Sequence, residues 1–330
     1  GLKGFNIDFK DHFPGYEGEL NEAKFAASNN DIDLIEENIS YQEFQELLDN
    51  YSFYQDDLVV GDEVGIPLYF LGKKTKNSEI KVVQVGEGAD ELFYGYDHWN
   101  RYLKLNKFFK PFFKSTKKYS SFKNHRLNML SNILFNRTSF AGGALGFNLK
   151  ELDSLIVDGL PSHSDLIFYA DNKWKDYFSN KNSKISKWMT LIDLKIRLPE
   201  LLLMRMDKLV MQSAVEARVP FLDHKLVEYV LSLPEELLID LTNTKSLLKK
   251  VALKYLPDQI INRKKQGFRA PIGEWIKKDE EKFYESVQQF NSLVNLFNER
   301  ELNKILSGKD YQKKWYLINL SNWHLARVAN

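Results

Sequence analysis

Residues 1–96 alternate between short apolar runs and amphipathic segments. The run 2–9 predicts a strand, 19–29 a helix and 31–39 a second strand, after which the Ser40-x-x-Glu43 spacing predicts a capped helix start. Another helix is expected over 64–76, and the β-branched run 80–85 predicts a strand that stops at Gly86. Strands separated by helices indicate a parallel sheet with helices on its faces.

Residues 97–330 lack clear strand signals and are dominated by long amphipathic segments, which predict a mostly helical second part. The sequence shows no fixed-period repeat, and no low-complexity linker lies between this part and residues 1–96. The sequence therefore favours an α/β fold whose segments 1–96 and 97–330 pack as one unit.

Composition narrows the class of protein. The 330 residues carry 46 Lys+Arg against 45 Asp+Glu, a net charge of +1, which argues against bulk attraction to nucleic acid. With no cysteine, a disulfide framework and a thiol nucleophile are excluded. The six histidines form no metal-ligand spacing, Gly-x-Ser-x-Gly is missing, and charges interrupt every apolar run, so we expect a soluble, cytoplasmic protein without a hydrolase triad.

The stretch 82–96 carries the strongest chemical signal. It runs from an apolar strand into Gly86-Glu87-Gly88 and then into a helix, an arrangement that lets backbone N–H groups approach a phosphate. Glu87, Asp90 and Glu91 would repel a polyphosphate unless a divalent cation lay between them, so the pattern indicates a site for metal plus phosphate. The alternative is that these acids merely complement a helix dipole.

Two further segments hold charges in distinctive surroundings. Glu216, Arg218 and Asp223 lie in an otherwise apolar stretch, and we expect them to form a buried bracing network rather than to act directly in catalysis. The lysines around Lys245 are, on composition alone, an exposed helix face. The basic, aromatic stretch 101–126 fits either a polyanion-binding surface or a solvated face over a core stripe, and the second interpretation is favoured.

In this order, the segments resemble the synthetase domain of glutamine-hydrolysing asparagine synthetases. The resemblance is carried by 86–96 (Gly-Glu-Gly-Ala-Asp-Glu-Leu-Phe-Tyr-Gly-Tyr), by 216–223 (Glu-Ala-Arg-Val-Pro-Phe-Leu-Asp), by Lys245-x-x-Leu248, and by Arg263-x-Lys265-x-Gly267-Phe268-x-x-Pro271-x-x-x-Trp275. It extends from Phe5 to about Trp275.

The resemblance implies a parallel-sheet ATP-pyrophosphatase core in 1–96, with 97–330 as the helical remainder of the same domain. It implies that ATP converts a substrate carboxylate into an acyl-adenylate, which then accepts ammonia. Asp90 would hold Mg²⁺ against pyrophosphate, with the Gly86 and Gly88 backbone near the phosphates. Glu87 would face the acyl-adenylate and the amine, and Lys245 would stabilise charge in the transition states.

Nucleotide contacts are also implied for Ile7, at the adenine, and for Val85, which replaces the serine of the family pattern. Lys249 likewise stands where the family has arginine. The Ser-Gly-Gly-x-Asp-Ser pyrophosphate loop would precede Phe5, and Ala141-Gly142-Gly143-Ala144 does not replace it. We expect that loop, and a glutaminase domain, upstream of Gly1, so this chain alone should not catalyse the full reaction.

The acceptor stays open. Aspartate would give asparagine, but a sugar acid or closure of a lactam ring is compatible with the same motifs, and so is an inactive binding protein that lacks the phosphate loop. The expected partner is thus a small-molecule carboxylate, with no nucleic acid or membrane, and a homodimer is allowed.

Overall fold

The computed structural model describes residues 1–11, 19–55, 62–109, 127, 130–131, 133, 146–159, 165–180, 183–263 and 270–328. Most of the basic stretch 101–126 and all of 141–144 lie outside these residues.

The first part of the chain forms the elements that its pattern predicts. These are β1 (Leu2–Phe9), α1 (Leu20–Ser28), β2 (Ile32–Ile39), α2 (Tyr41–Tyr54), α3 (Gly65–Asn77), β3 (Val82–Gln84) and α4 (Ala89–Leu92). The predicted capping box is present, because the Glu43 backbone N–H donates to Ser40 Oγ (3.2 Å) and the Ser40 N–H donates to the Glu43 carboxylate (2.9 Å). Both bonds satisfy backbone donors at the start of α2, so the helix begins at Tyr41.

The remainder is mostly helical, as predicted. Its elements are α5 (Asp97–Phe109), α7 (Leu149–Leu155), α8 (Asp165–Ser179), α9 (Ile185–Ile192), the π-helix η2 (Asp193–Leu203), α10 (Met204–Met211), β4 (Glu216–Arg218), the 3₁₀ turn η3 (Pro220–Leu222), α11 (His224–Ser232), α12 (Glu235–Leu238), α13 (Ser246–Ala252), α14 (Asp258–Ile261), α15 (Ile272–Lys278), α16 (Glu280–Val294), α17 (Glu299–Leu306) and α18 (Tyr311–Val328). Strand β4 was not predicted from the sequence.

The described strands pair in parallel, as expected, but they form two pairs rather than one sheet. β1 pairs with β2 from Leu2↔Ile32 to Phe9↔Ile39, and β3 pairs with β4 from Val82↔Glu216 to Gln84↔Arg218. The expectation of one parallel sheet is therefore wrong for the described strands, because β3 takes its partner from far along the chain. The division at residue 96 stays a prediction, and the β3–β4 pair crosses it.

Two apolar clusters hold these elements together. One joins β1, α2, α3, α10, α15, α16 and α18, and at its centre Phe44 stacks on Trp275 with ring centroids 4.4 Å apart. The other joins α4, α5, α8, α9 and α11 around Trp99 and Trp188. All four side chains are at most 1% exposed, and burial of each aromatic side chain contributes roughly 2–3 kcal/mol.

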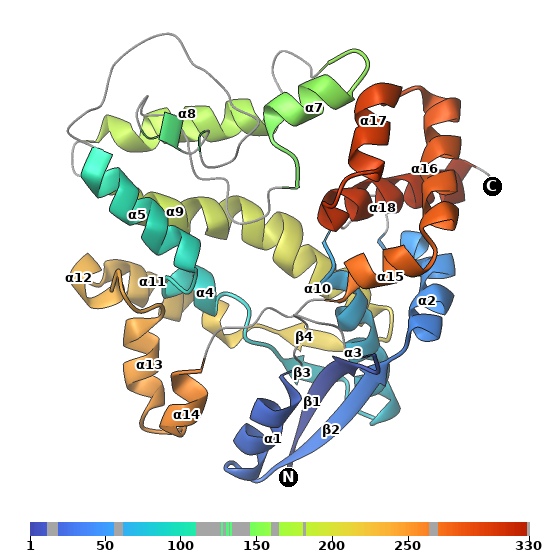
Figure 1. Cartoon of the computed structure of the whole chain (residues 1–330). Helices are drawn as coiled ribbons and strands as arrows, with labels where there is room; N and C mark the ends of the chain where they lie inside the picture. The colour runs from blue at the N-terminus through green and yellow to red at the C-terminus, as the bar shows by residue number, and fades with distance from the viewer. Residues whose placement is uncertain are drawn as a thin grey trace.

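Figure 1 shows β1 and β2 at one end of the molecule, with α7 and α8 at the opposite end. The helix α9–η2–α10 crosses the middle between them and ends beside β4. Among the described helices, none combines the length and the apolar character needed to cross a bilayer.

Candidate active site

The glycine loop follows directly from β3. The Val85 N–H continues the ladder by donating to the Arg218 carbonyl (2.9 Å), and the chain then turns through residues 86–88 into α4. Gly88 has φ +90°, and a Cβ there would overlap Leu222, so both backbone conformation and space require glycine. Apart from Gly86 and its two chain neighbours, no atom of the described residues lies within 4 Å of the place where a Cβ on Gly86 would stand. Among the described residues, that side of Gly86 is therefore open, which a phosphate-binding loop requires.

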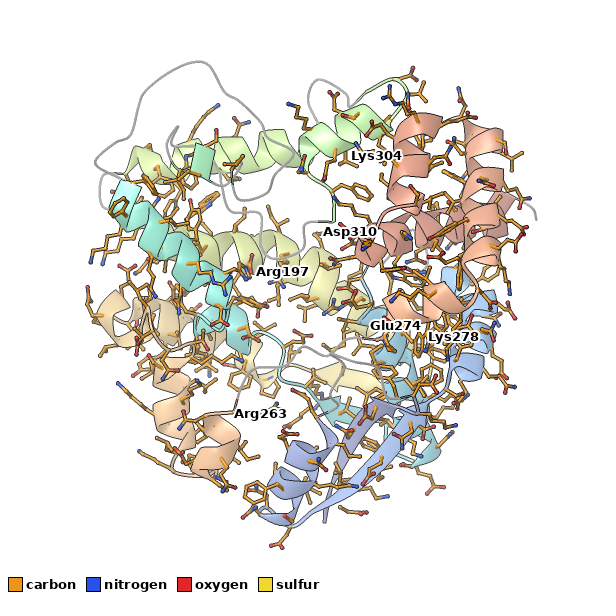
Figure 2. All side chains as sticks on the ribbon, viewed as in Figure 1. Arg197, Arg263, Glu274, Lys278, Lys304 and Asp310 are labelled. Atoms are coloured by element: carbon orange, nitrogen blue, oxygen red, sulfur yellow. The ribbon has the colours of Figure 1, made fainter. Side chains whose placement is uncertain are left out.

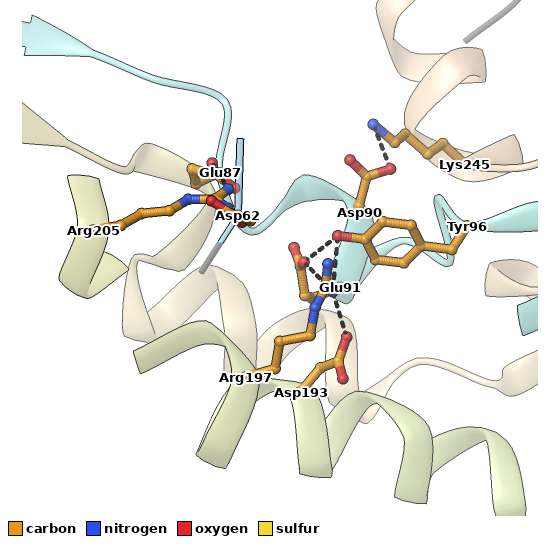
Figure 3. A network of polar contacts seen from close by, with 9 residues as sticks. All are labelled: Asp62, Glu87, Asp90, Glu91, Tyr96, Asp193, Arg197, Arg205 and Lys245. Carbon is orange, nitrogen blue, oxygen red and sulfur yellow. Dashed lines mark hydrogen bonds and ion pairs between the residues drawn. The ribbon is translucent and has the colours of Figure 1, made fainter. Parts of the chain in front are cut away.

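Asp90 and Lys245, both predicted site residues, meet in the fold (Figure 3). Lys245 Nζ lies 3.0 Å from Asp90 Oδ1, and their side chains are 26% and 23% exposed. Lys245 precedes α13 in the left-handed region (φ +53°), and its N–H donates to the Tyr94 carbonyl (3.4 Å). A Cβ on Gly95 would overlap both Asp90 and Lys245. Glycine at residue 95 is thus what allows the ion pair to form.

Glu87 faces a different cation, Arg205 on α10. Arg205 Nη2 lies 3.7 Å from Glu87 Oε1, and Arg205 Nη1 donates to Asp62 (Figure 3). Arg205 is 5% exposed, and this burial lowers its pKa to about 10, so it is still cationic at neutral pH. Sequence reasoning missed Arg205, although its place in the apolar stretch 201–210 marks it as a buried charge in need of partners.

Glu91 points away from the glycine loop into a buried network (Figure 3). Tyr96 donates its hydroxyl to Glu91 Oε1 (2.5 Å), and Arg197 Nη1 lies 3.3 Å from the same oxygen. Arg197 also donates to the Tyr96 hydroxyl and to Asp193, each at 3.0 Å. Burial, and then the Glu91 carboxylate, raise the pKa of Tyr96, while burial raises the pKa of Asp193 to about 7.

The three acids around the loop thus meet three different cations rather than one shared metal. Glu91, fully buried, has a structural place, and only Glu87 and Asp90 remain candidates for contact with a substrate. In the described part of the chain no group of three or more histidine, aspartate and glutamate side chains is arranged to hold a metal ion.

Arg205, which is buried, and Arg197, whose side chain is 14% exposed, belong to one continuous helix. Its central segment, η2, is a π-helix with Pro199 inside it, and proline lacks the N–H that regular helical bonding needs. Arg197 lies within η2, near the middle of the molecule in Figure 2, and Arg205 lies just after η2. The π segment thus helps to set the directions in which the two arginines point.

The predicted buried network of Glu216, Arg218 and Asp223 is wrong. Glu216 and Arg218 pair with each other (2.8 Å), but their side chains are 53% and 60% exposed. Alternation along β4 turns Ala217 toward the core and sends its two neighbours outward. Asp223 instead caps α11 by accepting from the Lys225 and Leu226 N–H groups.

The two apolar site residues lie in the core. Ile7 is 7% exposed on β1, opposite Glu37 of β2, and Val85 packs against the same core while half-buried. Their predicted nucleotide contacts stay predictions. In the motif Arg263 to Trp275, Arg263 pairs with Glu19 (2.9 Å) and Trp275 is buried, while residues 264–269 lie outside the described chain.

A cleft of about 620 Å³ lies beside Glu63. Its lining residues are Glu63, Ile272, Gly273, Glu274, Lys309, Asp310, Tyr311 and Gln312, and Figure 2 labels Glu274 and Asp310. Glu63 follows Asp62, the partner of Arg205. Burial and the Glu63 carboxylate raise the pKa of Tyr316, and Arg205 lowers it in part.

Comparison with known proteins shows the family of the chain. A sequence model of the asparagine synthase family matches residues 1–325. The chain belongs to the asparagine synthase family. It is 28% identical to asparagine synthetase [glutamine-hydrolyzing] 1 of Bacillus subtilis, over 99% of this chain and 52% of that protein. It is 29% identical to a putative asparagine synthetase [glutamine-hydrolyzing] of Mycobacterium tuberculosis, over 88% of this chain and 46% of that protein.

This asparagine synthase-family chain spans about half the length of the curated relatives it matches. Lys249, where the chain departs from the family pattern, is half-buried, and its Nζ donates to Asn243 Oδ1 (2.8 Å). Lys249 is therefore a different kind of residue from Lys245, four positions earlier, which reaches into the site.

Proposed function

We propose that this chain is the synthetase portion of an ATP-dependent amide-forming ligase with an ATP-pyrophosphatase-type core. It would convert a substrate carboxylate into an acyl-adenylate, release pyrophosphate, and pass ammonia derived from glutamine to the acyl carbon. The observation that carries the proposal is the Asp90–Lys245 pair beside the glycine loop (3.0 Å). Membership of the asparagine synthase family supports the same reaction class.

The residues fit a nucleotide with Mg²⁺. Among the described residues the Cβ side of Gly86 is open, Gly88 turns the chain, and Asp90 offers a partly exposed carboxylate. Mg²⁺ is commonly held by one or two carboxylates together with substrate phosphates, so a single aspartate is compatible with the metal. When bound there, the metal would neutralise charge on the phosphates.

The chain's own residues would then divide the work. A carboxylate oxygen of the substrate displaces pyrophosphate from the α-phosphorus of ATP, and Lys245 stabilises the negative charge on the phosphoryl oxygens. In the second step the amine nitrogen bonds to the acyl carbon and AMP leaves. Glu87 orients the amine or accepts the proton that it loses.

The identity of the carboxylate substrate is a separate part of the proposal. Aspartate is the leading candidate, because the relatives are named asparagine synthetases. The cleft near Glu63 is large enough for a small molecule, and sugar acids or lactam precursors stay as alternatives to be tested alongside aspartate.

Pyrophosphate exchange into ATP tests the first step. The longest reading frame that contains this chain should exchange labelled pyrophosphate into ATP only when its carboxylate substrate is present, with aspartate, a sugar acid and a lactam precursor tried in turn. Lys245→Ala should lower the exchange rate by about 10²- to 10³-fold, whereas Lys250→Ala, at an exposed position of α13, should leave it unchanged. Binding of ATP without exchange for any carboxylate would favour an inactive binding protein instead.

A further inference from the structure

Arg205 joins two acidic side chains that come from different parts of the chain. Asp62 precedes α3, Glu87 lies in the loop after β3, and Arg205 reaches both from α10. The two terminal nitrogens are divided between them, since Nη1 donates to Asp62 and Nη2 faces Glu87. Asp62 therefore sets the orientation of the guanidinium plane, and that orientation directs the second nitrogen at Glu87.

The contact between Arg205 and Glu87 is a charge–charge attraction rather than a hydrogen bond. At 3.7 Å the Arg205–Glu87 approach is longer than a hydrogen bond, so Arg205 acts on the carboxylate through its charge. The guanidinium side chain is 6% exposed, and solvent screens a charge in such surroundings only weakly. A cation held there attracts the carboxylate of Glu87 and restricts where it points.

We propose that Arg205 is a positioning residue for Glu87, anchored by Asp62. It keeps the Glu87 carboxylate directed toward the meeting point of amine and acyl carbon. This inference rests on the proposed function, in which Glu87 serves the second, amide-forming step. It predicts that Arg205 matters for amide formation and much less for adenylation, a separation that a purely structural residue would not produce.

The test uses the longest reading frame that contains this chain, with ammonium as the nitrogen source and two rates measured separately. Arg205→Lys keeps the charge but not the two-pronged geometry. It should lower the rate of amide formation about tenfold and change pyrophosphate exchange by less than about threefold. Arg205→Met should lower amide formation further, because it removes the positive charge as well as the two-pronged geometry.

A double-mutant cycle separates action through Glu87 from general damage. In the Glu87→Gln background, Arg205→Lys should cost less than about twofold in amide formation, since the group on which Arg205 acts is already neutral. Asp62→Asn, which removes only the anchor, should reproduce part of the Arg205→Lys loss. This variant keeps the proposal testable if Arg205→Met does not fold.

Arg197→Met is the matched control, because Arg197 is another arginine of the same helix whose acids are Glu91 and Asp193. It should lower thermal stability and change both rates by the same factor. Equal effects of the Arg205 variants on both rates, or a tenfold loss that persists in the Glu87→Gln background, would overturn the Arg205 proposal alone. Absence of exchange in the wild-type protein with every carboxylate would overturn the proposed function.

Discussion

Gly95→Ala places a single methyl group between Asp90 and Lys245. The methyl group would overlap Asp90 Oδ1 and Lys245 Cε, so one of the two side chains has to move. Gly95 is not among the residues with positive φ, and alanine there brings no left-handed strain. The substitution therefore tests the close approach of the ion pair by itself.

The expected effect on stability is small and the expected effect on catalysis is large. Both charged side chains are about a quarter exposed, so the ion pair contributes at most about 1 kcal/mol to folding, and crowding by the methyl group costs about 1–3 kcal/mol. A displacement of roughly 1 Å at a catalytic group lowers a rate by about 100-fold. We expect Gly95→Ala to lower pyrophosphate exchange by that factor while the protein stays folded.

Gly72→Ala provides a matched control. Its added Cβ would lie 3.0 Å from Val210 Cα and O, where α3 packs on α10, so it crowds the core without touching Asp90 or Lys245. Thermal melts should show comparable destabilisation of both variants, with normal exchange per folded molecule for Gly72→Ala. A Gly95→Ala protein that exchanges at the wild-type rate, or a Gly72→Ala protein that loses as much, would refute the reasoning.

Further predictions concern stability. Arg197→Met should lower the unfolding free energy in urea by about 3–5 kcal/mol, because Glu91 and Asp193 stay buried without their cation; a loss below about 1 kcal/mol would contradict this. Because the pKa of Asp193 is about 7 when folded and 3.8 ordinarily, the folded state retains a proton that the unfolded state releases between these values. The stability that this bound proton contributes is thus lost as pH rises from about 4 to 7. The melting temperature of Asp193→Asn should therefore fall less over that window than that of the wild type. Ser40→Ala should cost about 1 kcal/mol in the same urea assay, through loss of the α2 cap, and no change would show that the cap is redundant. Glu216→Ala should leave the melting temperature unchanged, since its partner is exposed; a clear drop would favour the buried network expected from sequence.

Local order could be predicted from the sequence wherever the cause is local. The start of α2 depends on a side chain and a backbone group three residues apart, and the left-handed turn at Gly88 depends on that residue's missing Cβ. The candidate residues Gly86, Glu87 and Asp90 lie on one short stretch between a strand and a helix, so the pattern of the stretch indicated them together. Only the resemblance to the family indicated Lys245 as a site residue, because the neighbouring sequence by itself indicates an exposed helix face.

The tertiary structure determined which charged side chains form ion pairs with one another. An apolar neighbourhood predicted burial for Glu216 and Arg218, but a three-residue strand beside β3 turns both outward. The same kind of neighbourhood does enclose Arg205, and no spacing in the sequence indicates that its partners are Asp62 and Glu87. Caps and turns are set by groups a few residues apart, whereas the partner of a buried charge is set by how helices and strands distant in sequence pack. The sequence alone therefore determined the loop and its flanking elements, and packing alone determined the ion pairs that surround it.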